Sequence, residues 1–121
     1  MPVNKILVVD DSSVDLLHLQ NILQQAGYTV YTATSGKEAV QKAESQKPDA
    51  ILLDIVMQEM DGFEACRRLT KGDQTRDIPV VFVTSKNQKA DRVWAQMQGA
   101  KALITKPYSQ DVILRQIQAL G

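Results

Sequence analysis

Short apolar runs alternate with longer amphipathic segments along this chain. Five runs are either continuously apolar or alternate apolar with polar positions, and both patterns are typical of β-strands. They cover Lys5–Asp11, Tyr28–Ala33, Ala50–Asp54, Val80–Thr84 and Ala102–Thr105. The continuous run over Val80–Thr84 is expected of a strand that is covered on both faces. Strands that alternate with helices predict right-handed crossovers, and therefore an α/β domain with a parallel sheet.

The segments between these runs carry the signals of helix starts. Ser12 or Ser13 can cap a first helix, because a hydroxyl oxygen accepts a hydrogen bond from a free backbone N–H of the first turn. The segment Ser35–Glu38 has the spacing of a capping box, and Ser109 can cap the last helix. The pattern predicts a helix after each strand.

The fourth helix has an apolar stripe of its own. Ala90, Val93, Trp94 and Met97 recur at helical spacing, which predicts one apolar side. We expect Trp94 to be a large core residue on that side.

Composition limits the class of protein. The 121 residues suffice for a single domain, which we expect to cover residues 1–121. Lys and Arg number 14, as do Asp and Glu, so the net charge is zero and a nucleic-acid or acidic-lipid surface is not expected. One cysteine, Cys66, and one histidine, His18, allow neither an internal disulfide nor a Cys/His zinc site. Because neither a secretory signal nor a run of membrane-spanning length is present, we expect no membrane insertion and a cytoplasmic protein.

Chemically active residues stand where the predicted strands end. Asp10 and Asp11 end the first run, Asp54 ends the third, Thr84 ends the fourth, and Lys106 follows the fifth. Sites in open α/β sheets form at the carboxyl ends of the strands, so these side chains are expected to meet if the first and third strands are adjacent. Three clustered carboxylates repel one another, and a divalent cation relieves that repulsion. Oxygen ligands of this kind suit Mg²⁺, so the cluster predicts a metal.

Phosphoryl transfer fits this set of residues. Asp54 is the candidate nucleophile, and the product is an aspartyl phosphate. The negative charge on the equatorial oxygens needs neutralising, which Mg²⁺, Lys106 and the Thr84 hydroxyl can share. Any one of these residues alone is more simply explained as a turn or cap residue. Their occurrence together on four strand ends favours a site.

Four segments carry a resemblance to a known family. They are VVDDS (Val8–Ser12), LLDIVMQEMDGFE (Leu52–Glu64), VVFVTS (Val80–Ser85) and GAKALITKPY (Gly99–Tyr108). In this order and spacing, the chain resembles the receiver domain of bacterial two-component response regulators. The resemblance implies a doubly wound, flavodoxin-like fold: a five-stranded parallel sheet of order 2-1-3-4-5 with five flanking helices.

The resemblance also implies a metal site. Asp11 and Asp54 match direct Mg²⁺ ligands, with the backbone carbonyl of Val56 as a third. Asp10 matches the acid that orients metal-bound water. Mn²⁺ is the alternative ion.

The same resemblance implies the roles of the remaining residues. Asp54 matches the phosphorylated aspartate, Thr84 the hydroxyl that follows the phosphoryl group, and Lys106 the lysine that pairs with it. The phosphoryl group would come from a histidine kinase or from acetyl phosphate. The family catalyses only its own phosphorylation and slow hydrolysis, so the chain is not expected to be an enzyme in the wider sense.

A longer segment suggests a subfamily. Residues Thr84–Tyr108 are similar to stand-alone receivers of pilus-driven twitching and phototaxis systems, which carry a comparable Trp-containing fourth helix. The output would be contact with a downstream signalling or motor protein through the surface of the fourth helix, fifth strand and fifth helix. Competition for the kinase, as a phosphate sink, is the other possible output. Lys86, Lys89, Arg92 and Lys101 near that surface would favour an acidic partner.

Two positions depart from the family pattern. Gln58 stands where the family usually has proline, which restores a backbone donor and loosens the loop after Asp54. Leu103 stands where the family usually has an aromatic ring that rotates inward on activation. Either Thr84 and the loop after it transmit the signal, or the switch is weak.

The same residues allow other functions to be compared with this one. A pseudo-receiver that binds without phosphorylation usually lacks one of the acids or the lysine, and here all are present. A Mg²⁺-dependent aspartyl phosphatase of the haloacid dehalogenase type needs a second acid two residues after its nucleophile. Ser12, Ser13 and Val56 occupy those positions after Asp10, Asp11 and Asp54. A flavin-binding module is disfavoured because no Ser/Thr/Gly-rich phosphate loop follows the first strand.

Overall fold

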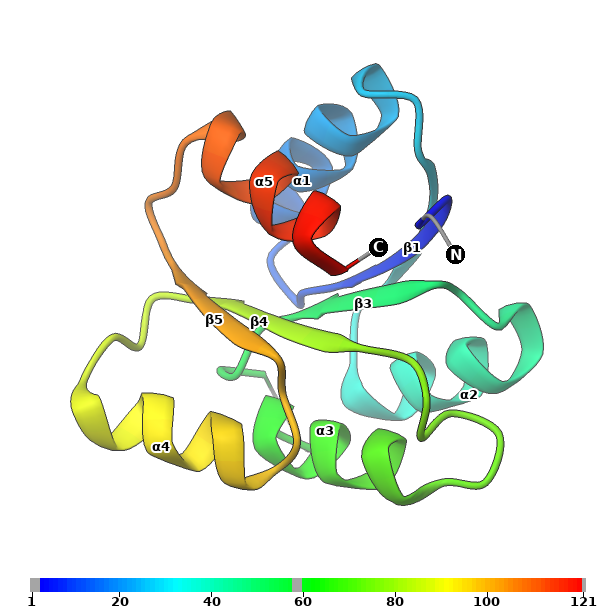
Figure 1. The fold of residues 1–121 in the computed structure, drawn as a ribbon, viewed down its shortest axis with the longest axis vertical. Helices are drawn as coiled ribbons and strands as arrows, with labels where there is room; N and C mark the ends of the chain where they lie inside the picture. Colours follow the sequence, from blue (N-terminus) through cyan, green and yellow to red (C-terminus); the bar gives the residue numbers. More distant parts are fainter. Residues whose placement is uncertain (1–2, 58–59, 121) are drawn as a thin grey trace.

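A parallel sheet of five strands forms the centre of the molecule, in the order β2-β1-β3-β4-β5 (Figure 1). The computed structural model describes residues 3–57 and 60–120. Helices α1 and α5 cover one face of the sheet, and helices α2, α3 and α4 cover the other (Figure 1). The doubly wound architecture and the strand order are those expected from the sequence.

Three of the strands are shorter than the runs that predicted them. They are β1 (Lys5–Val9), β2 (Thr29–Ala33), β3 (Ala50–Leu53), β4 (Val80–Thr84) and β5 (Ala102–Thr105). The bounds predicted for β4 and β5 are confirmed. The runs predicted for β1 and β3 extended to Asp11 and Asp54, which lie beyond the strands, and the run predicted for β2 began one residue early at Tyr28. The carboxylates therefore stand in the loops at the carboxyl edge of the sheet.

Serine caps begin three of the five helices. The helices are α1 (Ser13–Gln25), α2 (Gly36–Gln46), α3 (Gly62–Lys71), α4 (Lys89–Met97) and α5 (Gln110–Leu120). The Ser12 hydroxyl accepts a hydrogen bond from the Asp15 N–H, and Ser109 accepts one from the Val112 N–H. Ser35 caps α2 by accepting from the Glu38 N–H, but the Glu38 carboxylate turns back to the Thr34 N–H, so the expected capping box is only half formed.

Alternate residues of each strand pack on opposite faces of the sheet. In β1, Leu7 and Val9 belong to the core under α2, α3 and α4, whereas Ile6 and Val8 belong to the core under α1 and α5. All four are buried, which explains the continuous apolar run in the sequence. Cys66 of α3 is also fully buried, and burial raises the pKa of its thiol to about 12.

The expected orientation of α4 is wrong. Trp94 is 53% exposed and Met97 is 70% exposed, and Val93 also faces outward. Ala95 is the buried residue of α4. Helical spacing identifies one apolar side of a helix but does not say which surface that side meets. Here α4 turns Ala95 to the core and presents its apolar stripe at the surface.

Within residues 3–57 and 60–120, no helix combines the length and apolar character that crossing a membrane requires.

Asp49 ties the amino end of β1 to the loop before β3. Its Oδ2 accepts hydrogen bonds from the Lys5 N–H at 2.8 Å and the Asn4 N–H at 2.9 Å. These bonds, the Lys5 bond first, lower the pKa of the Asp49 carboxyl below its ordinary value. Folding therefore favours the ionised form of this group.

We expect Asp49→Ala to lower the free energy of unfolding at pH 7 by about 1 kcal/mol, because two N–H groups lose a charged acceptor at a solvent-exposed site. The folded-state pKa is lowered, so this stabilisation is fully present above the ordinary Asp pKa of 3.8. It is lost as the pH falls further through the folded-state pKa. Urea unfolding of both proteins at pH 7 and pH 3 should show the difference between them shrinking in acid. Asp49→Asn, which keeps an oxygen acceptor, should show a smaller loss, and an equal deficit at both pH values would contradict this interpretation.

Candidate functional site

Two aspartates and one lysine from three strand ends meet at the carboxyl edge of the sheet. Val9 of β1 pairs with Leu53 of β3, so the residues that follow them, Asp10 and Asp54, lie side by side. The Lys106 Nζ donates to Asp10 Oδ2 at 2.8 Å and to Asp54 Oδ2 at 3.0 Å. The two carboxylate side chains are only 8% and 10% exposed. The structure thus places a partly buried ammonium, 17% exposed, between two buried carboxylates.

Backbone N–H groups fix the other oxygen of each carboxylate. Asp10 Oδ1 accepts from the Ser12 N–H at 2.9 Å, and Asp54 Oδ1 accepts from the Val56 N–H at 3.2 Å. Each bond spans two residues, the short range that aspartate commonly bridges in turns. Both carboxylates are therefore held in place by their own loops, with Oδ2 directed at Lys106.

Burial and ion pairing act in opposite directions on these groups. Burial raises the pKa of Asp10 above its ordinary value, and the bonds from Lys106 and the Ser12 N–H offset only part of that effect. Burial alone would lower the pKa of Lys106. Its hydrogen bonds to Asp10, Asp15 and Asp54 outweigh burial and hold the pKa of the ammonium above its ordinary value. Lys106 therefore stays charged at neutral pH.

Asp15 joins this site although the sequence pattern did not single it out. Its Oδ2 accepts from Lys106 Nζ at 3.0 Å, from the first turn of α1. The side chain is 46% exposed, so it closes the site on the solvent side. One sequence signal could have identified Asp15: it stands three residues after the cap Ser12, in the first turn of α1. Because α1 begins at the carboxyl edge of the sheet, its first turn lies beside the strand ends.

Thr84 and Asp11 do not join the hydrogen bonds around Lys106. Thr84 ends β4 and is fully buried, and its hydroxyl accepts from the Lys86 N–H at 3.3 Å. Asp11 is exposed, and across the described part of the chain its carboxylate takes part in no hydrogen bond or ion pair. Val56 exposes its side chain in the loop after Asp54. Gln58, the first departure from the family pattern, lies outside the described residues.

The donor set at this edge suits a hard divalent cation. Among the described residues, no three Asp, Glu, His or Cys side chains form a group arranged to hold a metal ion. The Oδ2 atoms of Asp10 and Asp54 both accept hydrogen bonds from the ammonium of Lys106. Mg²⁺ takes oxygen ligands and is commonly bound by one or two carboxylates together with waters and a phosphate. The carboxylates of Asp10 and Asp54, with Asp11 adjacent in the chain, fit that requirement in their chemistry.

Gly62 allows α3 to begin directly against the backbone of Asp54. A Cβ at this position would lie 2.2 Å from the Asp54 carbonyl oxygen and 2.6 Å from Ile55 Cα. The Gly62 N–H also donates to the Ile55 carbonyl oxygen at 2.8 Å. No side chain fits there without moving the backbone that carries Asp54.

Comparison with known proteins settles the family. Residues 6–118 match the model of the response regulator receiver domain. The chain belongs to that family. Receiver domains are signalling modules of two-component systems: they work with histidine kinases and downstream effectors, and they bind Mg²⁺ at their phosphorylation site. The resemblance found in the sequence is thereby confirmed.

Relatives of this receiver domain occur alone and within longer chains. It is 42% identical over 116 residues to the protein PilH of Pseudomonas aeruginosa, covering 96% of each chain. It is 39% identical to the alkaline phosphatase synthesis transcriptional regulatory protein PhoP of Bacillus subtilis, covering 96% of this chain and 48% of PhoP. The chemotaxis protein CheY4 of Vibrio cholerae superposes with a TM-score of 0.93 at 30% identity, covering 98% of this chain and 99% of that one. The fold and the family are therefore shared along nearly the whole sequence.

We expect Gly62→Ala to lower the free energy of unfolding by about 2–3 kcal/mol, because the new methyl group overlaps the backbone of Asp54 and Ile55. Gly27→Ala is the matched control, since its φ of +96° is strained for alanine but nothing lies within 4 Å of the added carbon. That control should lose about 1 kcal/mol. Urea unfolding measures both, and a loss at Gly62 no greater than at Gly27 would contradict the close approach.

Proposed function

We propose that this receiver domain spans residues 1–121 and accepts a phosphoryl group on the carboxylate of Asp54. The observation that carries the proposal is the partly buried ammonium of Lys106, held within 3.0 Å of the buried carboxylates of both Asp10 and Asp54. A partly buried cation beside a buried carboxylate can neutralise a phosphoryl oxygen that arrives there. The phosphoryl donor would be the phosphohistidine of a histidine kinase, or acetyl phosphate.

The transfer forms one bond and breaks one. An oxygen of the Asp54 carboxylate attacks phosphorus, and the P–N bond of phosphohistidine, or the P–O bond of acetyl phosphate, breaks with its electron pair going to the leaving group. Lys106 can then donate to a phosphoryl oxygen with the N–H that it directs at Asp54 in the free state. The Thr84 hydroxyl would pair with another oxygen. Hydrolysis of the aspartyl phosphate restores the carboxylate.

A divalent cation completes this assignment. Asp11 and Asp54 would hold Mg²⁺, or Mn²⁺, together with the backbone carbonyl of Val56, and Asp10 would orient its water. When bound, the ion supplies positive charge that neutralises phosphoryl oxygens during transfer.

The proposed activity is that of a signalling module in the cytoplasm and not of a metabolic enzyme. The phosphatase alternative requires a second acid two residues after the nucleophile, where Val56 follows Asp54. We expect no multiple turnover on small phosphate esters. The pseudo-receiver alternative predicts instead that no phosphoryl group is accepted.

The outer side of α1 supports docking of a kinase. Val14 and Leu17 are both exposed on this helix, beside the first turn that carries Asp15. Large apolar side chains exposed next to a reactive site are typical of a contact surface for a protein partner.

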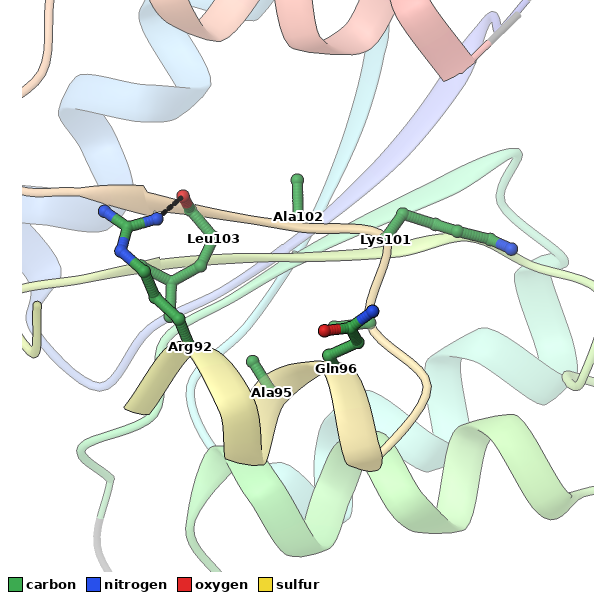
Figure 2. Close-up of a pocket in the computed structure, with 7 residues that line it drawn as sticks. Arg92, Ala95, Gln96, Lys101, Ala102 and Leu103 are labelled. Carbon is green, nitrogen blue, oxygen red and sulfur yellow. Dashed lines mark hydrogen bonds between the residues drawn. The ribbon is translucent and has the colours of Figure 1, made fainter. Parts of the chain in front are cut away.

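The surface of α4 and β5 supports an output partner. Figure 2 shows a groove between these elements, with Arg92, Gln96 and Lys101 at its rim and Leu103 on β5. Arg92 donates to the Leu103 carbonyl oxygen at 3.4 Å and to the Thr105 hydroxyl at 3.2 Å. The two cations favour an acidic partner, which we place on the surface of α4, β5 and α5.

The apolar stripe of α4 adds contact area on the same helix. Val93, Trp94 and Met97 are exposed there. The likeness to PilH agrees with the similarity of Thr84–Tyr108 to receivers of pilus-driven motility. We propose that the partner is a signalling or motor protein of such a system, and that service as a phosphate sink is the alternative output.

A switch can operate here without an aromatic ring at Leu103. The Thr84 hydroxyl accepts the Lys86 N–H in the described state, so a Thr84 that turns to a phosphoryl oxygen releases the loop before α4. Arg92 ties α4 to the backbone of β5, which gives that release a route to the groove. Two such states pre-exist, and phosphorylation shifts their populations.

Incubation with acetyl phosphate and Mg²⁺ should add one phosphoryl group to the intact mass of the protein. We expect Asp54→Asn to abolish this gain, because an amide cannot form the acyl phosphate, and chelation of Mg²⁺ to reduce it strongly. Lack of a gain in the wild-type protein under all conditions would favour the pseudo-receiver alternative. Asp73→Asn, an exposed charge change in the loop before β4, is the matched control and should leave the gain intact.

Thr84→Ala should leave the mass gain in place but remove most of the change in Trp94 fluorescence that follows phosphorylation or addition of beryllofluoride. The reason is that the variant lacks the hydroxyl whose turn toward the phosphoryl oxygen is proposed to release the Ser85–Gln88 loop before α4. Thr84→Ser, which keeps a hydroxyl, should respond as the wild-type protein does. Equal fluorescence changes in wild type and Thr84→Ala would remove Thr84 from the switch.

A further inference from the structure

Asp15 is the third acceptor of an ammonium that has only three N–H groups. Lys106 Nζ lies 2.8 Å from Asp10 Oδ2 and 3.0 Å from the Oδ2 atoms of Asp15 and Asp54. Its donors are therefore fully used in the free state. Asp10 and Asp54 reach the lysine from strand ends, whereas Asp15 reaches it from α1 and is the most exposed of the three.

Hydrogen bonds connect Asp15 to Asp10 in a closed ring. The Ser12 N–H donates to Asp10 Oδ1, and the Ser12 hydroxyl accepts the Asp15 N–H. Lys106 closes the ring by donating to the Oδ2 atoms of both aspartates. The start of α1 thus fixes the Asp15 carboxylate relative to the site, and its contact with Lys106 is part of a connected arrangement.

The charge of Asp15 affects cations and anions at this site in opposite ways. Asp10, Asp15 and Asp54 carry three negative charges around the single positive charge of Lys106. An additional carboxylate attracts a divalent cation and repels a phosphoryl group. It also competes for the ammonium that a phosphoryl oxygen would engage.

We propose that Asp15 is a positioning residue that shares Lys106 with Asp54, strengthening cation binding and shortening the lifetime of the aspartyl phosphate. This inference rests on the proposed function of Asp54. Asp15 touches neither reacting atom and acts through Lys106 and through its charge. Its role is to keep the phosphorylated state short-lived while the site retains its cation.

Asp15→Asn separates charge from shape, because the amide oxygen can still accept from Lys106. We expect the Mg²⁺ dissociation constant, measured by calorimetric titration of the unphosphorylated protein, to rise about threefold to tenfold. In saturating Mg²⁺, the half-life of the phosphorylated protein, followed by intact mass after removal of acetyl phosphate, should lengthen about threefold. Asp15→Glu keeps the charge and should lie closer to wild type in both measurements.

Asp73→Asn provides the matched control, since it removes one exposed negative charge at the opposite edge of the sheet. It should leave both quantities unchanged. A purely structural role of Asp15 would weaken cation binding and shorten the lifetime together. That result, or an Asp15→Asn protein equal to wild type, overturns the inference.

The two measurements also separate this inference from the proposed function. If wild type gains no phosphoryl group, the proposed function of Asp54 fails, and the Mg²⁺ titration alone decides the role of Asp15. An unchanged dissociation constant in Asp15→Asn, or no Mg²⁺ binding by wild type, then overturns the inference as well. If wild type is phosphorylated and the variant does not differ from it, only the inference fails.

Discussion

The ammonium of Lys106 makes a cluster of buried carboxylates possible at the end of this sheet. Asp10 and Asp54 lie on adjacent strand ends and are almost inaccessible to water, so each would raise the cost of ionising the other. Lys106 follows β5, and strand β4 lies between β5 and β3, which Asp54 follows. The long side chain of Lys106 extends past the end of β4 and brings its positive charge to Asp54. Loss of one partner from such a buried group costs about 3–5 kcal/mol, because a charge is left uncompensated. The ends of β1, β3 and β5 are thereby tied together by electrostatics in addition to the backbone ladder.

The backbone around the site is as constrained as its charges. The loops after Asp10 and Asp54 return an N–H to their own carboxylates, so neither side chain is free to follow the lysine. Gly62 allows the start of α3 to pack directly against the carbonyl of Asp54, which restricts the loop after Asp54. The mobile partner in this arrangement is Lys106, whose flexible stem can redirect its N–H groups while the carboxylates stay fixed.

Sequence patterns predicted the sheet and the strand-end chemistry because both depend on short-range signals. Continuous apolar runs marked β4 and β5 to the residue, whereas the runs for β1 and β3 were carried into the aspartates and ended one or two residues late. The order of the strands came from the resemblance to a family, since apolar runs alone do not specify their neighbours. The burial predicted for Trp94 was wrong because helical periodicity shows which residues share one side of a helix. It does not show whether that side faces the core or the solvent. Asp15 was missed because its contact with Lys106 depends on the position of α1 relative to β5. That position is set by contacts between residues far apart in the chain, which a local sequence pattern does not reveal.

Helix α4 is held to the domain with less apolar burial than the other helices. Ala95 is its buried residue, whereas α1, α2, α3 and α5 each bury two or more. A methyl group contributes little to the transfer free energy that keeps a helix in place, so local opening of α4 costs a small part of the global free energy of unfolding. We therefore expect amide hydrogens of α4 to exchange with solvent ahead of those in the central strands, without loss of the site. The fold thus combines a rigid edge that carries the site with one helix, α4, whose packing on the domain is stabilised by only a small free energy.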